Sequence, residues 1–185
     1  MSKNVCFIYT DTNGLHTTNE NVSKKNLYNF ARIISLHYSI GTFDNMYKYT
    51  ETKNVTHILT PKTINFDKTA LKFHNITYEN ALAKGVDNHI VITELKNDLK
   101  DVDIIVSHNL SFHLKAIQVE CFRTAITLDF SKFILIDMIS FGHNYTYPKL
   151  VDLIKKLKIK NIDNLNQLEQ FRHVFVKLYE NSLIV

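Results

Sequence analysis

Ile104–Lys115 (Ile-Ile-Val-Ser-His-Asn-Leu-Ser-Phe-His-Leu-Lys) contains the clearest secondary-structure signal in this 185-residue chain. Three consecutive β-branched residues predict a buried strand, which stops at the polar segment Ser107–Asn109. A helix is expected from about Leu110 to Arg123, because apolar side chains recur there at positions i, i+4, i+7 and i+11. A polar segment between a strand and a helix is where α/β proteins commonly place functional groups.

Strands are expected on the N-terminal side of this segment, where β-branched and aromatic residues gather. The predicted strands are 4–10, 30–40, an irregular one within 41–52, and 55–60, which Pro61 ends. Asp11–Leu15 is expected to form a turn after the first strand. In that turn Gly14 is free to take a positive φ, and Asn13 tolerates one.

Helical periodicity dominates the rest of the chain. The predicted helices are 67–73, 77–84, 90–99, 110–123, 147–157 and 164–179, with one more strand at 133–138. Thr77 is expected to cap the second helix and Gly85 to end it, and Pro148 lies in the first turn of the fifth. The order of elements predicts a single α/β domain over residues 1–185, with a mixed central sheet flanked by helices.

Composition narrows the class of protein. A content of 45% hydrophobic and 22% charged residues is ordinary for a globular chain and excludes a disordered or fibrous one. No apolar run approaches the roughly 20 residues of a membrane span, and the first residues lack the apolar core of a signal peptide. We therefore expect an intracellular, cytoplasmic protein without a membrane partner. Cys6 and Cys121 lie in apolar segments and are expected to be reduced core thiols.

The formal net charge of +4 is compatible with a polyanionic partner, but the basic residues are spread along the chain. Only Lys155–Lys160 concentrates them, and that pattern is more typical of the solvated end of a helix. Abundant Asn, Lys, Ile, Tyr and Phe indicate an AT-rich coding sequence, as in a large DNA virus or an AT-rich microbe. A viral chain would be expected in the host cytoplasm.

Five short segments follow one another in an order that spans nearly the whole chain. They are Tyr9–Leu15 (Tyr-Thr-Asp-Thr-Asn-Gly-Leu), His74–Thr77 (His-Asn-Ile-Thr), Val106–His113 (Val-Ser-His-Asn-Leu-Ser-Phe-His), Asp137–Ile139 (Asp-Met-Ile) and Lys149–Leu153 (Lys-Leu-Val-Asp-Leu). In turn they resemble Asp-x-Glu-Thr-Thr-Gly-Leu, His-Gly-Ile-Thr, Val-x-His-Asn-x-x-Phe-Asp, Asp-Thr-Leu and Lys-Leu-x-x-Leu of the DnaQ-like (DEDD) 3′–5′ exonuclease family. The resemblance implies a ribonuclease H-like fold.

The resemblance also implies a two-metal site in which four carboxylates hold divalent cations that activate water and stabilise the leaving oxygen. Carried over by position, the first Asp falls on Tyr9, the Glu on Asp11 and the second-motif Asp on His113. The acid of the last motif falls on Gln167 or on Glu169, depending on the register. At most two carboxylates are kept, so the catalytic motifs look degenerate, and Asp11 is the one candidate metal ligand among the first three.

Each of these residues also has a structural interpretation. Tyr9 is expected to fill the space that metal ions would take, and Asp11 either forms the turn or remains a metal or phosphate ligand. His108 and Asn109 are expected to bond the backbone where the strand ends, and Asp137 to be structural. A mononuclear site that would suit a softer metal needs three side chains: His113, Asp11 and either His16 or His108. Phe112, Ile117 and Phe122 are expected in the core.

We therefore expect a catalytically degenerate exonuclease-fold protein that binds single-stranded DNA or RNA, or a protein partner, without a cofactor. The candidate nucleic-acid-binding residues are Asn13, Gly14, Leu15, His16, His108, Asn109 and Lys115. One alternative is a divergent 3′–5′ exonuclease that uses Mg²⁺ or Mn²⁺ with Asp11, Glu169 and either Asp137 or Asp163. A second alternative is a structural or assembly subunit that binds no nucleic acid.

Overall fold

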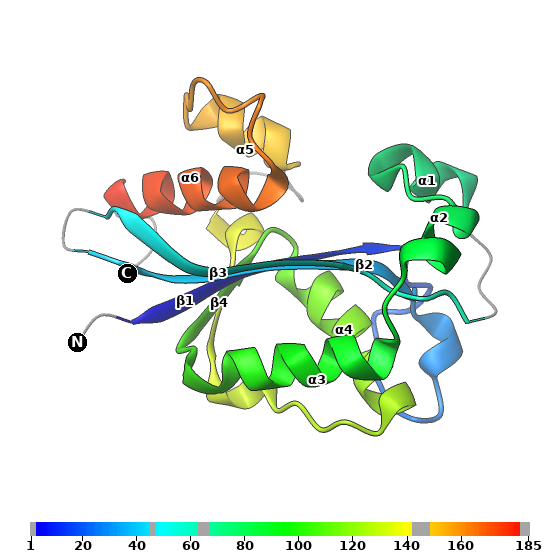
Figure 1. Ribbon diagram of the computed structural model, residues 1–185. Coiled ribbons are helices and arrows are strands. Elements are labelled where there is room, and N and C mark those ends of the chain that lie inside the picture. The colour runs from blue at the N-terminus through cyan, green and yellow to red at the C-terminus, as the bar shows by residue number, and fades with distance from the viewer. Residues whose placement is uncertain (1–2, 45–46, 63–66, 142–148, 182–185) are drawn as a thin grey trace.

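The computed structural model describes residues 3–44, 47–62, 67–141 and 149–181, which fold around a mixed five-stranded sheet (Figure 1). The strands are β1 (Asn4–Thr12), β2 (Ile33–Phe43), β3 (Tyr49–Ile58), β4 (Ile104–Ser107) and β5 (Ile134–Asp137), in the order β3-β2-β1-β4-β5. β1, β2 and β3 pair antiparallel, whereas β4 and β5 extend the sheet parallel to β1. The predicted α/β class and mixed central sheet are confirmed.

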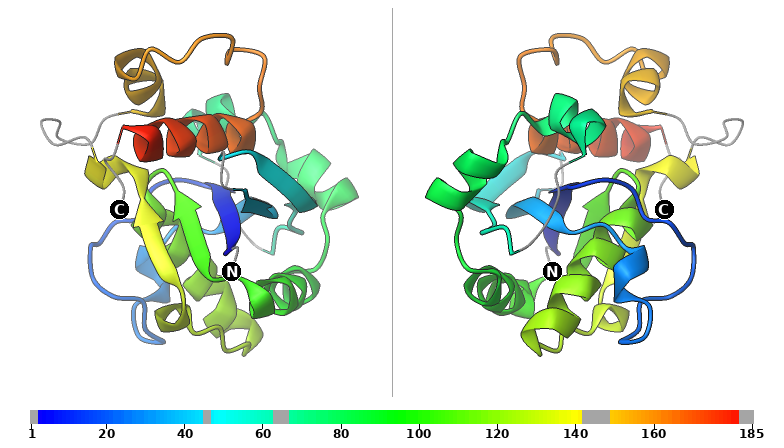
Figure 2. Two further views of the ribbon diagram at one scale, coloured as in Figure 1. Left: turned by 90° about the vertical axis from the view of Figure 1, so that its left-hand side faces the viewer. Right: turned by 90° about the vertical axis from the view of Figure 1, so that its right-hand side faces the viewer.

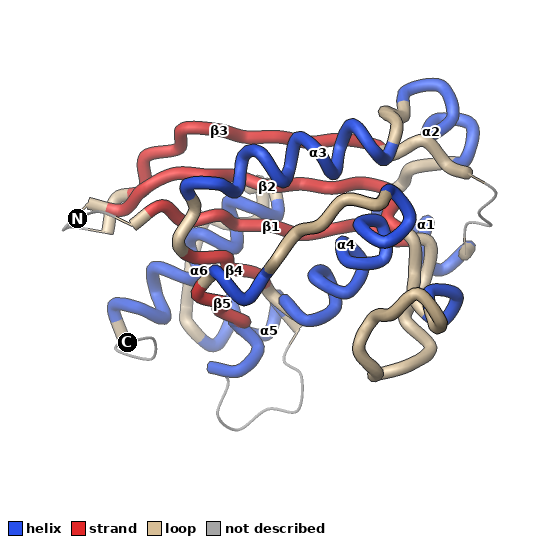
Figure 3. Tube along the Cα trace, turned by 90° about the horizontal axis from the view of Figure 1, so that it is seen from below, coloured by secondary structure: helices blue, strands red, loops and turns tan. Residues whose placement is uncertain are grey.

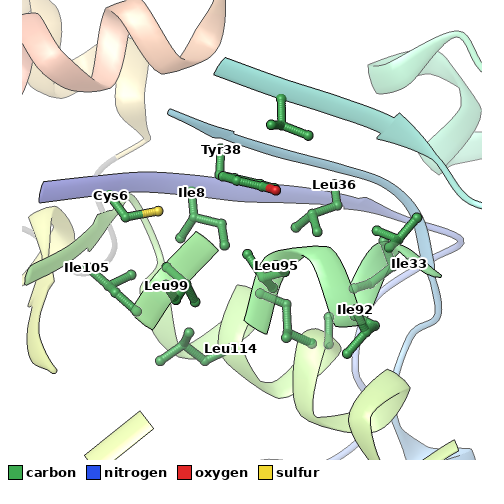
Figure 4. Packing of buried hydrophobic residues seen from close by; sticks show 14 of the residues in the cluster. Cys6, Ile8, Ile33, Leu36, Tyr38, Ile92, Leu95, Leu99, Ile105 and Leu114 are labelled. Carbon is green, nitrogen blue, oxygen red and sulfur yellow. The ribbon is translucent and has the colours of Figure 1, made fainter. Parts of the chain in front are cut away.

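One face of the sheet is covered by α3 (Asn88–Asp98) and α4 (Leu110–Thr124), which lie beneath it in Figure 1 and in front of it in Figure 3. Alternate residues of β1 point into this layer, and Figure 4 shows Ile8 directed toward Leu95 and Leu99. Burying a side chain of this size stabilises the fold by about 1.5–3 kcal/mol. This layer is the larger of two apolar cores.

The other face is covered by α6 (Gln167–Glu180), with α5 (Leu150–Lys156) packed beyond it. Val5 and Phe7 of β1 contribute to this second core, and Tyr9 packs against it. Because side chains alternate along a strand, Asp11 shares the α6 face with Tyr9. This alternation sets which functional candidates can meet.

Two short helices, α1 (Lys68–His74) and α2 (Tyr78–Lys84), lie at one end of the sheet, as Figures 1 and 2 show. Thr77 caps α2 by accepting a hydrogen bond from the N–H of Asn80 at 3.1 Å, and Gly85 ends it, as predicted. Single 3₁₀ turns complete the chain: η1 (Leu27–Asn29), η2 (Leu99–Asp101), η3 (Phe130–Lys132) and η4 (Met138–Phe141). Among the helices of the described ranges, none has the length and apolarity to cross a membrane.

Besides β2, which spans Ile33–Phe43 and not the predicted 30–40, two strand predictions need correction. β1 continues through Asp11 to Thr12, because both residues pair with β2, and neither Asn13 nor Gly14 takes a positive φ. The segments predicted as an irregular strand and a separate short one form the single strand β3, because their backbone pairs continuously with β2 apart from one bulge. In both cases pairing with β2 sets the extent of the strand, and the periodicity of a single segment does not reveal its pairing partner.

Two helix predictions also differ from the structure. α6 begins at Gln167 and not at Asn164, because Asn166 and Glu169 form a capping box that fixes its first turn. α5 begins at Leu150, and the predicted first turn with Tyr147 and Pro148 lies outside the described residues. The two cysteines are free and buried, as predicted.

Candidate functional site

A pocket of about 610 Å³ lies where β1 ends, between α1 and the start of α4. Asp11 and Phe112 contribute to its wall, and Leu15 and Phe73 stand at it with 82% and 83% of their surfaces exposed. Large apolar side chains that remain exposed beside a hollow commonly mark a ligand or partner site. We call this hollow the Leu15–Phe73 pocket.

Asp11 is held by two side chains of β2. Its Oδ2 accepts a hydrogen bond from Ser35 Oγ at 2.5 Å and lies 3.2 Å from His37 Nε2. Burial alone would raise the pKa of Asp11, but the hydrogen bonds from His37 and Ser35, with the charges of His37 and His74, lower it overall. The carboxylate therefore remains ionised, and one of its oxygens is already engaged by the protein.

Tyr9 occupies the position to which the resemblance assigns the first metal-binding Asp. Its ring stacks on His37 with centroids 4.3 Å apart and an angle of 5° between the planes, and it meets Phe171 of α6 edge-on at 5.9 Å. Burial raises the pKa of the Tyr9 phenol, so it stays neutral at physiological pH. The space beside Asp11 is thus packed with aromatic rings.

His113 lies on the opposite side of β1 and joins α4 to it. Its Nδ1 accepts a hydrogen bond from the N–H of Thr10 at 3.0 Å and lies 3.0 Å from Thr10 Oγ1. β4 pairs with β1 only as far as Phe7, so β4 offers no acceptor to the buried N–H of Thr10. The His113 imidazole supplies that acceptor. Burial lowers the pKa of His113 to about 4, and the ring is neutral with its proton on Nε2.

His16 fixes the segment that follows Leu15. Its Nδ1 accepts from the N–H of Ala31 at 3.0 Å, so its Nε2 carries the proton and donates to the carbonyl of Phe112 at 3.0 Å. The ring also stacks on that of Phe112, with centroids 4.2 Å apart. His16 therefore positions two walls of the pocket, and burial, aided by the charge of Lys115, lowers its pKa.

Asn13 and Lys115 maintain the chain around the pocket. Asn13 Oδ1 accepts from the N–H of Arg32 at 2.7 Å, and its own N–H donates to the Arg32 carbonyl at 3.0 Å. Lys115 Nζ donates to the carbonyl of Asn19 at 2.7 Å. Gly14 lines the pocket, where an added Cβ would meet only Asp67 Cβ, at 4.0 Å. Of these candidates, Gly14 therefore faces the pocket directly.

Asp137 caps α4 from the neighbouring strand. Its two carboxylate oxygens accept from the N–H groups of Asn109 at 2.9 Å and Leu110 at 2.8 Å. Asn109 takes a φ of 68°, and its side chain makes no capping bond to α4, so the side-chain bond predicted there is not found; its backbone N–H donates to Asp137 instead. The ring of His108 lies 6.5 Å from that of Phe171. Asp137 has the structural role that we expected.

The two candidate positions for the acid of the last motif, Gln167 and Glu169, lie at the start of α6. Gln167 is exposed, and Glu169 accepts a hydrogen bond from the N–H of Asn166 at 2.9 Å within the capping box. The α6 side chain that meets Tyr9 is instead Phe171. Across the part of the chain that the structure describes, no three His, Cys, Asp or Glu side chains form a group that could hold a metal.

The side chains at the motif positions do not fit a pair of Mg²⁺ ions. Two such ions need several carboxylate oxygens at one point. The positions supply a neutral phenol at Tyr9, one engaged carboxylate at Asp11, an imidazole at His113 whose Nδ1 is engaged, and a capping carboxylate at Glu169.

Three residues of the site, Ser35, His37 and Phe73, were not predicted from the sequence. Ser35 and His37 face Asp11 and Tyr9 because the antiparallel register pairs them one to one. The alternation of side chains along β2 shows that Ser35 and His37 share one face of the sheet. Only the pairing register shows that this places them opposite Asp11 and Tyr9. Phe73 is recognisable in the sequence only as an apolar residue of a short helix.

The core assignments along α4 hold in part. Ile117 is buried, as predicted. Phe112 is half-buried and lines the pocket, and Phe122 is exposed. Phe112 and Phe122 lie on faces of α4 other than the one that Ile117 buries in the core.

Structural comparison relates this fold to exonuclease I. Product-bound exonuclease I superposes with a TM-score of 0.73 over 99% of this chain and 45% of that one, at 12% identity. E. coli exonuclease I with a dT13 oligonucleotide gives 0.69 (96% and 41%, 13% identity), and the Methylocaldum szegediense enzyme 0.70 (96% and 40%, 13%). Neither a protein-family model nor a curated protein matches the sequence. The chain has this ribonuclease H-like fold and spans less than half the length of these proteins.

Proposed function

We propose that this chain binds single-stranded nucleic acid in the Leu15–Phe73 pocket and does not cleave it by a two-metal mechanism. One observation carries the proposal: the pocket is open and apolar, while the neighbouring Asp11 carboxylate is bonded to Ser35 and His37. The second acid in the pocket wall, Asp67, is also bonded to the protein, because it accepts from the N–H groups of Thr69 and Ala70 at the start of α1. A site with an apolar surface for a base, and with both acids held by protein groups, is suited to binding.

The pocket has the chemistry of a base-stacking site. Leu15 and Phe73 offer exposed apolar surface at its mouth, and Phe112 offers a ring at its wall. Stacking of a base on an aromatic side chain contributes about 1–3 kcal/mol and tolerates any base. The net charge of +4 adds a favourable long-range attraction to phosphates.

The comparisons support the same class of ligand. E. coli exonuclease I, which shares the fold, has structures in complex with dT13 and dA16 oligonucleotides. A single-stranded nucleic acid bound by this chain could insert a terminal or unstacked base into the pocket at the end of β1. The fold does not indicate whether the ligand is DNA or RNA, and titration with an oligonucleotide of each kind decides between them.

The proposal is tested with labelled oligo(dT) and oligo(rU), measured by fluorescence anisotropy at low salt. Phe73→Ser is expected to weaken binding by roughly tenfold, in line with the loss of one stacking contact. The matched control is Tyr28→Ser, because Tyr28 is 92% exposed and lies outside the pocket wall. Equal affinity of Phe73→Ser and the wild type would show that the pocket is not the binding site.

A further inference from the structure

A second groove, of about 490 Å³, lies at the opposite end of the parallel strands. Its wall includes Val102, just before β4, and Phe133, just before β5, so it opens at the amino ends of these strands. The Leu15–Phe73 pocket lies at the carboxyl end of β1, which runs parallel to them. The two hollows are therefore separate.

Three lysines surround this groove: Lys96, Lys100 and Lys132. All three are exposed, and none of their ammonium groups forms an ion pair or hydrogen bond with a described residue, whereas Lys53 and Lys177 do form ion pairs. Asp129, the acid in the wall, accepts hydrogen bonds from the N–H and Oγ of Ser131 at 3.0 and 2.7 Å. We call this hollow the lysine groove; it offers positive charge for an anionic partner.

The floor of the lysine groove is apolar. Leu99 and Val102 are buried in the core beneath it, and Leu128 and Phe133 pack against that core. Cations above an aliphatic floor suit a ligand that carries carboxylates and an apolar side chain together. A nucleic acid is matched less well, since Phe133 is the one ring in the groove wall and is half-buried against the core.

The edge of the sheet next to the groove favours a peptide. Within the described residues β5 pairs with β4 alone, and its Ile134 and Leu135 are 49% and 44% exposed. An open strand edge presents backbone N–H and C=O groups to which an extended peptide can add as a further strand. The groove and this strand adjoin in the sequence, because Phe133 of the groove wall directly precedes Ile134, the first residue of β5.

We propose that the lysine groove docks an acidic peptide segment of a partner protein. Carboxylates of the segment pair with Lys96, Lys100 and Lys132, and an apolar side chain lies over the floor. The extended backbone of the segment continues along β5. This inference is independent of the nucleic-acid pocket and does not require it.

The test uses labelled synthetic peptides with alternating Asp and Leu, alternating Asp and Ser, and alternating Lys and Leu. Anisotropy is expected to show binding of the Asp–Leu peptide, weaker binding of Asp–Ser and none of Lys–Leu. The triple variant Lys96→Glu, Lys100→Glu and Lys132→Glu is expected to bind Asp–Leu at least tenfold more weakly. The triple variant Lys155→Glu, Lys158→Glu and Lys160→Glu changes the net charge equally and is expected to bind normally.

Several outcomes would overturn the inference. The wild type could fail to bind the Asp–Leu peptide, or both triple variants could lose affinity equally, which would indicate unspecific charge attraction. A groove variant that loses oligo(dT) affinity but keeps peptide affinity would assign the groove to nucleic acid. Light scattering that shows a dimer in the wild type and a monomer in the groove variant would assign it to a second copy of the chain.

Discussion

The Nδ1 atom of His113 accepts a hydrogen bond from the backbone N–H of Thr10 at 3.0 Å. This contact fastens the first turns of α4 to the end of β1, on the side of the strand away from Tyr9 and Asp11. A neutral ring is required, because a protonated Nδ1 would place two N–H groups against each other. The junction that positions the Leu15–Phe73 pocket is therefore sensitive to acid.

Stability is predicted to fall as the pH drops from about 6.5 to about 4. An unfolded chain protonates His113 near pH 6.5, but the folded chain does so only near 4, so the unfolded state binds more protons between these values. The loss is on the order of 3 kcal/mol from this residue. Urea unfolding across this range measures it, and His113→Gln should flatten the slope. An unchanged slope in His113→Gln would contradict the assignment.

Glu120 is predicted to be the most costly acid to remove. It is fully buried and accepts from Arg32 Nε at 2.5 Å, Arg32 Nη2 at 3.1 Å and Asn88 Nδ2 at 2.9 Å. Glu120→Ala leaves the guanidinium without its partner and should lower the free energy of unfolding by about 3–5 kcal/mol. The exposed Glu79→Ala should change it by less than about 0.5 kcal/mol. Similar losses in both variants would exclude a special role for the pair.

Asp137 is predicted to stabilise α4 and not to bind metal. Asp137→Ala removes the acceptor for three backbone N–H groups, those of Asn109, Leu110 and Ile139, and should cost about 1–2 kcal/mol, as for other helix caps. Asp163→Ala, at an exposed position, is the control. Mn²⁺ should leave the melting temperature of the wild type unchanged. A rise with Mn²⁺ that Asp137→Ala abolishes would identify a metal ligand.

The elements best predicted from the sequence are those with strong local signals. The β-branched run Ile104–Val106 and the apolar stripe of α4 gave boundaries within a residue of the structure. β3 was predicted poorly because it is an edge strand of mostly polar residues in which Val55 alone is buried, and its continuity depends on pairing with β2. Local pattern cannot report a pairing partner.

The candidate site shows the same division. Asp11, Gly14 and Leu15 belong to one local motif, and the structure places all three in the wall of one pocket. The contacts of Asp11 with Ser35 and His37 arise from strand register, and the choice of Phe171 to face Tyr9 arises from the rotation of α6. Both contacts depend on tertiary packing, which brings together residues that lie far apart in the chain. A local sequence motif therefore does not reveal them.

The central claim is tested most directly by incubating the protein with 5′-labelled oligo(dT) and Mg²⁺ or Mn²⁺. One native gel reads binding, and one denaturing gel reads strand length from the same samples. We predict a shifted complex that contains a full-length strand, and no shortening at any metal concentration. Metal-dependent shortening from the 3′ end that Asp11→Ala, purified in parallel, abolishes would contradict the account and make the chain an active exonuclease.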